Sequence, residues 1–186
     1  MTMQRGRLLG LVMLAALALS ACGFHLRGSD GSFNLPFATL FVTLPDASPL
    51  AIDLKRNIRA NGGTEIVSAR AGADGVVDVL SDPDKTRGKT ILSLSGTGRV
   101  REYLLSYTIV FRVLDREGRE LLGPTTIALT RPITFNESQL LAKETEEALL
   151  YRDMKTDMVQ QMLRRIAAVK PVLPAMSVVP AAPAKP

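Results

Sequence analysis

Apolar and polar residues alternate most clearly over residues 100–114. The period of two is that of a strand with one face on a hydrophobic core. That face carries Tyr103, Leu105, Tyr107, Ile109, Phe111 and Val113. A tight turn at residues 115–118 follows, so we predict that residues 119–135 form the antiparallel partner strand. Its two prolines, Pro124 and Pro132, indicate a strand at the edge of a sheet.

Shorter runs of β-branched and apolar residues predict strands earlier in the chain. These runs cover residues 39–44, 64–68, 76–80 and 90–95. The polar residues 81–89 separate the last two runs. They either connect two strands or form a bulge or loop inside one long strand.

One segment before these strands has the helical period instead. A serine and a proline at residues 48–49 are typical of a helix start. The apolar residues Leu50, Leu54 and Ile58 recur on one face. The sequence Asn-Gly-Gly at residues 61–63 ends the pattern, so we predict an amphipathic helix between these two signals.

A longer helix is predicted after residue 135. Asn136 and Gln139 have the spacing of a capping box. One side of the helix then carries Leu140, Leu150, Tyr151, Met154, Met158, Met162, Ile166 and Val169. We interpret the methionines as core filling rather than as a metal or cofactor site, because a flexible thioether fills irregular gaps well. The carboxylates Glu144, Glu146 and Glu147 are expected on a solvated face.

These elements predict one domain over residues 39–170. Its class is α/β of the α+β type, with two helices packed on a mostly antiparallel, mixed, four-stranded sheet. A chain of 186 residues suits one such domain rather than two. Residues 171–186 are rich in proline and alanine and carry almost no charge, so we predict a disordered tail.

Residues 1–21 have the pattern of an export signal. Two arginines precede an apolar run that is too short for a membrane span. Residues 19–22 are Leu-Ser-Ala-Cys, which matches a bacterial lipobox with cleavage before Cys22. Glycine, serine and proline dominate the residues that follow. We therefore predict a lipidated N-terminus and tether over residues 22–38.

Cys22 is predicted to carry S-diacylglycerol and an N-palmitoyl chain. It is the only cysteine, so an intrachain disulfide is excluded. An ordinary signal peptide with an incidental cysteine is the alternative. Three acyl chains would anchor the protein stably, since each buried methylene contributes about 0.8 kcal/mol. Glycine rather than aspartate follows Cys22, which favours the outer membrane over the inner one.

Charge and composition exclude several functional classes. The net charge of +5 becomes +3 once the two arginines of the signal are removed, which is too mild to indicate nucleic-acid binding. The only histidine, His25, lies three residues from the predicted anchor. The sequence has no Ser-His-Asp arrangement, metal-ligand cluster or phosphate-binding loop. We predict no enzyme, no metal and no cofactor other than the covalent lipid.

Basic residues form the remaining candidate site. Lys85, Arg87 and Lys89 lie in the polar segment between two predicted strands, and Arg99 and Arg101 follow a Ser-Gly-Thr-Gly turn. If the flanking strands pair around that turn, these side chains converge. Such a cluster could hold the phosphates of an anionic lipid by charge-assisted hydrogen bonds. A solubilising loop is an equal alternative.

Three motifs, in this order, resemble one family. They are the lipobox followed by Gly-Phe-His-Leu-Arg at residues 23–27, Gly-Arg-Val-Arg-Glu-Tyr at residues 98–103, and Leu-Ala-Lys at residues 141–143 with the acids and amphipathic helix that follow. Together they are similar to the LPS-assembly lipoprotein family LptE. The similarity spans most of residues 19–169.

The resemblance implies a domain inside the lumen of the outer-membrane β-barrel LptD, on its periplasmic side. Members of the family plug the barrel, aid its assembly and bind lipopolysaccharide for delivery to the outer leaflet. Lys143 falls on a lipid-binding lysine of the family. A second family arginine falls at about Gly96, where this chain departs from the pattern, and Arg99 or Arg101 is the candidate to supply that charge.

A function of a different class remains open. A free, periplasm-facing lipoprotein could bind a small ligand or a cell-wall polymer without a barrel partner. Copurification separates the two, because only a barrel subunit leaves detergent extraction as a stoichiometric complex.

Overall fold

The computed structural model describes residues 34–170. The chain divides into two compact units, residues 1–32 and 33–186, and all described elements belong to the second. The predicted signal peptide, the lipidation of Cys22, most of the tether and the tail lie outside the described residues. No described helix has the length and hydropathy needed to cross a membrane.

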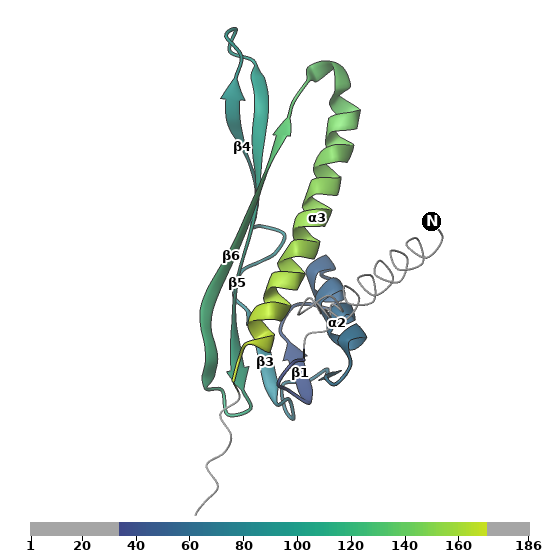
Figure 1. Ribbon diagram of the computed structural model, residues 1–186, viewed down its shortest axis with the longest axis vertical. Coiled ribbons are helices and arrows are strands. Elements are labelled where there is room, and N and C mark those ends of the chain that lie inside the picture. The colour runs from purple at the N-terminus through teal and green to yellow at the C-terminus, as the bar shows by residue number, and fades with distance from the viewer. Residues whose placement is uncertain (1–33, 171–186) are drawn as a thin grey trace, which may run out of the picture. The chain divides into compact units, whose positions relative to one another are not determined.

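The two longest strands of the sheet lie side by side (Figure 1). β5 (Val100–Asp115) and β6 (Glu120–Thr134) pair antiparallel, with Ile109 opposite Ile127. Among the described strands β6 pairs with β5 alone, so the edge position predicted from its two prolines is confirmed.

Two shorter strands lie end to end along the other edge of β5. β3 (Gly75–Val79) pairs with residues 111–115, and β4 (Arg87–Leu94) pairs with residues 100–107. Between them, the Leu80 amide donates to the Val110 carbonyl at 2.8 Å and the Thr108 amide donates to the Thr86 carbonyl at 3.2 Å. The polar segment is therefore a loop that interrupts one long line of pairing.

This loop is shorter than the predicted residues 81–89. Arg87 and Lys89 belong to β4, so they lie in a strand rather than in a polar loop. Their places are fixed by pairing with β5, with Arg87 opposite Tyr107 and Lys89 opposite Leu105.

The N-terminal strands make the sheet mixed. β1 (Thr39–Val42) pairs parallel with both β2 (Glu65–Ile66) and β3, which gives the order β2-β1-β3-β5-β6, with β4 paired to the same edge of β5 as β3. The α+β class is confirmed. The sheet has six strands rather than four, because the interrupted edge contributes two strands and the two-residue β2 also pairs.

The first helix matches its sequence pattern. α2 (Pro49–Asn61) buries Leu50, Ala51, Leu54 and Ile58. It ends at Gly62, whose φ of 69° is a conformation that favours glycine. The predicted serine cap is only a backbone feature, since Ser48 is extended but its side chain makes no capping hydrogen bond.

α3 (Leu140–Ala167) lies along β5 and β6, and α2 contacts it (Figure 1). The methionine stripe is confirmed as core, because Met154, Met158 and Met162 are fully buried. Leu140, expected on the same apolar side, is instead 48 % exposed. The core between helix and sheet therefore occupies the C-terminal half of α3.

The predicted capping box is wrong in its second half. A short 3-10 turn, η1 (Glu137–Gln139), precedes α3. The Asn136 side chain accepts a hydrogen bond from the Ser138 amide at 3.1 Å, so asparagine caps this turn. The Gln139 side chain makes no capping hydrogen bond.

Candidate functional site

The α3-facing side of the sheet becomes basic toward the tip of the β4–β5 hairpin. Residues directly opposite in an antiparallel pair share a face. Arg87 and Lys89 therefore lie on the same face as Tyr107 and Leu105, which are buried. The N-terminal half of α3 stands over this face without burying any of its own residues. The space between helix and sheet is hollow here instead of filled.

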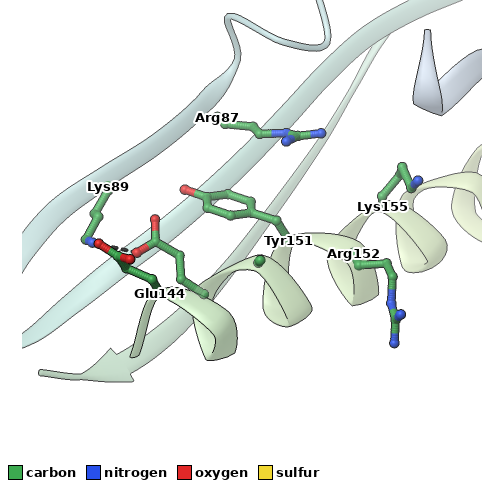
Figure 2. A pocket seen from close by; sticks show the side chains of 8 residues that line it. Arg87, Lys89, Glu144, Tyr151, Arg152 and Lys155 are labelled. Atoms are coloured by element: carbon green, nitrogen blue, oxygen red, sulfur yellow. Dashed lines mark hydrogen bonds and ion pairs between the residues drawn. The ribbon is translucent and has the colours of Figure 1, made fainter. Parts of the chain in front are cut away.

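Three adjoining hollows occupy this space, and we call them together the basic trough. The first has a volume of about 610 Å³, and its lining includes Arg87, Lys89, Glu147, Tyr151, Arg152 and Lys155 (Figure 2). The third has a volume of about 540 Å³, and its lining includes Arg101, Glu102, Phe135, Asn136, Gln139 and Lys143. A small second hollow of about 60 Å³ shares Lys89 with the first and Lys143 with the third.

Ion pairs neutralise part of the charge in the first hollow. Lys89 Nζ lies 2.5 Å from Glu147 Oε2 and 4.5 Å from the centroid of the Tyr103 ring. Lys155 Nζ lies 2.6 Å from Asp53 Oδ2, which belongs to α2. The predicted solvated position of Glu147 is wrong, because this carboxylate links α3 to β4.

Aromatic rings hold the remaining β4 cation of this hollow. The Arg87 Cζ atom lies 5.3 Å from the centroid of the Tyr107 ring and 5.6 Å from that of Tyr151. The Tyr151 hydroxyl donates to the Gly88 carbonyl at 2.7 Å. Burial raises the pKa of both tyrosines, and the positive charge of Arg87 opposes the increase at each. Both hydroxyls therefore keep their protons at neutral pH.

The third hollow pairs a constrained lysine with a free arginine. Lys143 Nζ donates to Thr134 Oγ1 and to Glu146 Oε2, both at 2.8 Å, and its side chain is only 17 % exposed. Arg101 lines the same hollow from β5, and no carboxylate in residues 34–170 forms an ion pair with it. An anion entering this hollow meets one partly neutralised and one uncompensated cation, together with the carboxylate of Glu102, which accepts a hydrogen bond from Ser93 Oγ at 2.7 Å.

The structure divides the basic residues that were expected to converge. Arg101 and Lys143 share the third hollow, while Arg87 and Lys89 line the first. Arg99 lines a further hollow of about 300 Å³, which shares Phe135 and Asn136 with the third. The pairing register separates them, since β4 places Arg87 opposite Tyr107, six residues along β5 from Arg101.

Lys85 lies apart from all three hollows. It is in the loop between β3 and β4, where its Nζ pairs with Asp82 Oδ2 at 3.2 Å and its side chain is 84 % exposed. The Ser-Gly-Thr-Gly turn is confirmed, with a hydrogen bond of 2.7 Å from the Ser95 amide to the Arg99 carbonyl.

Sequence reasoning missed the contribution of α3 to the first hollow. Tyr151, Arg152 and Lys155 line it, and none was a candidate. A signal was present, because Glu144, Glu147, Tyr151 and Lys155 recur at intervals of three or four residues and so share a helix face. That polar stripe runs directly into the methionine stripe.

Comparison with known proteins assigns the family. The family model described as LptE, lipopolysaccharide-assembly, matches residues 37–166. The chain belongs to the LptE family. This range includes β1 through most of α3, and thus the whole basic trough.

Relatives and solved structures agree with this family. LPS-assembly lipoprotein LptE of Photorhabdus laumondii is 27 % identical over 168 residues, which cover 89 % of this chain and 88 % of the relative. The LPS-assembly lipoprotein LptE of Pectobacterium atrosepticum is 26 % identical over 168 residues, which again cover 89 % of this chain and 88 % of the relative.

Among solved structures, an uncharacterized lipoprotein B from Nitrosomonas europaea is 38 % identical, with a TM-score of 0.66 over 78 % of this chain and 91 % of that one. The rare lipoprotein B from Shewanella oneidensis is 28 % identical, with a TM-score of 0.60 over 69 % of this chain and 93 % of that one.

Family membership gives this chain a role in lipopolysaccharide assembly as a lipoprotein associated with the outer membrane. The LptE family is a transport and assembly family rather than a known enzyme family, and cofactors are not known for it. Within residues 34–170, no group of three or more His, Cys, Asp and Glu side chains is placed to hold a metal ion.

Proposed function

We propose that this protein binds lipopolysaccharide through phosphates held in the third hollow, and that it does so as the partner of the β-barrel LptD. The observation that carries the lipid part is the meeting of Arg101 and Lys143 in one hollow of about 540 Å³. A guanidinium without a carboxylate partner in residues 34–170 and an ammonium that lines the same hollow are donors suited to phosphate oxygens.

This geometry also favours one of two candidates for the charge that is missing at Gly96. Arg101 lines the same hollow as Lys143, whereas Arg99 lines the adjoining hollow, which Lys143 does not reach. Arg101 is therefore the better candidate for the second basic residue of the lipid site.

A double substitution tests the lipid site. Arg101→Gln with Lys143→Gln removes two charges, and each charge-assisted hydrogen bond contributes about 1.5–3 kcal/mol before solvent and salt reduce it. We expect lipopolysaccharide binding to weaken at least about tenfold, with the difference from wild type shrinking as salt is raised. Equilibrium titration at two salt concentrations measures both effects.

Arg59→Gln with Arg164→Gln is the matched control. Both arginines are exposed on helices, lie outside the lining of the trough, and give the same change in net charge. A small loss in the control supports the site. Equal losses in both double variants would reduce the binding to general electrostatics, and no loss in the first would remove the site.

The proposed barrel partner has its own support in an apolar surface. Ile91, Leu92 and Leu94 lie near the end of β4 and are about half exposed, and Leu141 on α3 is 80 % exposed. Large apolar side chains exposed close together at one end of a protein are typical of an interaction site. Together with membership of the family, it supports insertion of the hairpin end into a partner such as the LptD lumen.

Copurification through a C-terminal tag tests the partner. We expect a stoichiometric complex with a large β-barrel protein in detergent, and we expect Leu92→Ser with Leu94→Ser to weaken it. Ile52→Ser is the control, because Ile52 is equally exposed but lies on α2. Recovery of the protein alone would favour the rival function, a free periplasm-facing lipoprotein that binds a small ligand or cell-wall polymer.

The anchor completes the proposal. Cys22 would hold the protein in the outer membrane through S-diacylglycerol and an N-palmitoyl chain, with the domain in the barrel lumen on the periplasmic side. Mass spectrometry of the N-terminal peptide decides this, because an unmodified Cys22 would contradict it.

A further inference from the structure

Arg87 is the cation of the first hollow that contacts two aromatic rings. Its guanidinium lies over the rings of Tyr107 and Tyr151, with 5.3 and 5.6 Å from Cζ to the centroids. Tyr107 is fully buried, and the hydrogen bond of Tyr151 to the Gly88 carbonyl fixes the second ring. Figure 2 shows Arg87 above the Tyr151 ring, with Lys155 on the same side of the helix. The guanidinium is therefore preorganised.

The charge of Arg87 is not used within the described part of the chain. No carboxylate in residues 34–170 forms an ion pair with it, whereas Lys89 and Lys155 are each paired at 2.5–2.6 Å. Cation–π contacts occupy the faces of a guanidinium and leave the N–H donors at its edges available. Those edges suit two oxygens of one anion.

The size and position of the first hollow indicate which anion. The hollow is open, has a volume of about 610 Å³ and is lined by four cations and by the carboxylates of Glu144 and Glu147, so it has space for a phosphate and the sugar that carries it. Tyr151 follows Lys143 by eight residues on α3, which separates the first and third hollows by about 12 Å along the helix. The small second hollow connects them.

We infer that Arg87 is the centre of a second phosphate site, which takes a sugar phosphate from the same lipid that Arg101 and Lys143 bind. The inference rests on the proposed function, which it extends from one phosphate to two. A headgroup with phosphates at both ends of a disaccharide has the matching chemistry. Two sites on one ligand also raise affinity, because the second contact is intramolecular.

Arg87→Lys tests this site, because lysine keeps the charge but lacks the planar fork. We expect binding of bisphosphorylated lipopolysaccharide to weaken about tenfold. Arg152→Lys is the matched control, because Arg152 lines the same hollow and no contact with an aromatic ring holds it. We expect the control to change binding less than about twofold.

A lipopolysaccharide with one of the two phosphates removed is the second probe. With it, we expect the difference between wild type and Arg87→Lys to fall below about threefold. An equal loss with both lipids would overturn the two-phosphate inference, and so would wild-type affinity in a variant with a native circular dichroism spectrum. If Arg87→Lys fails to fold, Arg87→Gln is subjected to the same comparison.

The affinities of the two variants distinguish failure of this inference from failure of the proposed function. Loss of affinity in Arg101→Gln with Lys143→Gln, but not in Arg87→Lys, leaves the proposed function standing and removes the second site. Wild-type affinity in both removes the proposed function as well.

Discussion

The two halves of α3 face the same sheet but differ in packing, since only the C-terminal half buries side chains. The C-terminal half buries six residues, from Met154 to Ile166, against the sheet and α2. The N-terminal half, from Leu140 to Asp153, buries none. Its inward stripe consists of glutamate, tyrosine and lysine where the other half has methionine. One continuous helix therefore belongs to a packed apolar core at one end and to an open trough lined by charged side chains at the other.

The sheet changes along with the helix. β5 presents Tyr107, Ile109 and Phe111 at the core end, all fully buried, and Arg101 at the trough end. Two polar walls do not close on each other, because burying an unpaired charge is costly. The core fixes the position of helix and sheet, and that rigidity sets the spacing of the cations in the trough.

The largest expected effect comes from the C-terminal half of α3. Met158→Ala removes a fully buried side chain from a packed core and leaves a cavity. We expect the free energy of unfolding to fall by about 2–5 kcal/mol. Denaturant titration measures this.

Leu141→Ala is the corresponding substitution in the N-terminal half of α3. Leu141 is 80 % exposed, so we expect a change within about 0.5 kcal/mol. Similar losses for both variants would mean that the N-terminal half packs as tightly as the C-terminal half, and the comparison would fail.

A smaller effect is expected at the boundary between the halves. Tyr151→Phe removes the hydrogen bond to the Gly88 carbonyl and keeps the ring beneath Arg87. We expect a loss of about 1 kcal/mol in thermal or chemical unfolding. A neutral result would show that the tie between α3 and the β4 backbone contributes nothing to stability.

The smallest effect at neutral pH is expected from the same change at Tyr107. Its buried hydroxyl has no hydrogen-bond partner among the described residues, so Tyr107→Phe should leave stability unchanged or slightly higher.

Alkaline pH separates Tyr107 from its phenylalanine variant. Burial raises the pKa of Tyr107 above its ordinary 10.0. Below pH 10 both states keep the proton. As pH rises from 10 through the raised pKa, the unfolded chain loses its proton first, and stability falls. Tyr107→Phe should show a shallower fall, and identical slopes for both proteins above pH 10 would contradict this.

Much of the fold follows from periodicity. The period of two gives β5, the period of 3.6 gives α2 and the methionine stripe of α3, and proline gives the edge position of β6. The number of strands does not follow, because whether residues 81–89 connect two strands or interrupt one depends on the pairing partner. The exposure of Leu140 could not be predicted from the helix pattern either, because it depends on how far along α3 the helix packs against the sheet.

The site was less accessible to sequence reasoning. Basic residue types identified Arg87, Lys89 and Arg101 as candidates, and the family resemblance added Lys143. Strand register and the packing of α3 on the sheet decide which of them meet. Tyr151 escaped because an aromatic residue on the apolar side of a helix is usually core. Its role depends on Arg87, which is 64 positions away in the sequence. The two residues meet only because α3 packs against the sheet that contains β4.

The most direct test of the central proposal locates the lipid on the protein. A photoreactive amino acid replaces Gln139, which lines the third hollow, or Arg59 on α2 as a control, in the full-length protein incubated with lipopolysaccharide. We predict crosslinks to lipopolysaccharide from position 139 and none from position 59. Crosslinking at position 59 alone, or equally at both, would contradict a lipid site in the basic trough.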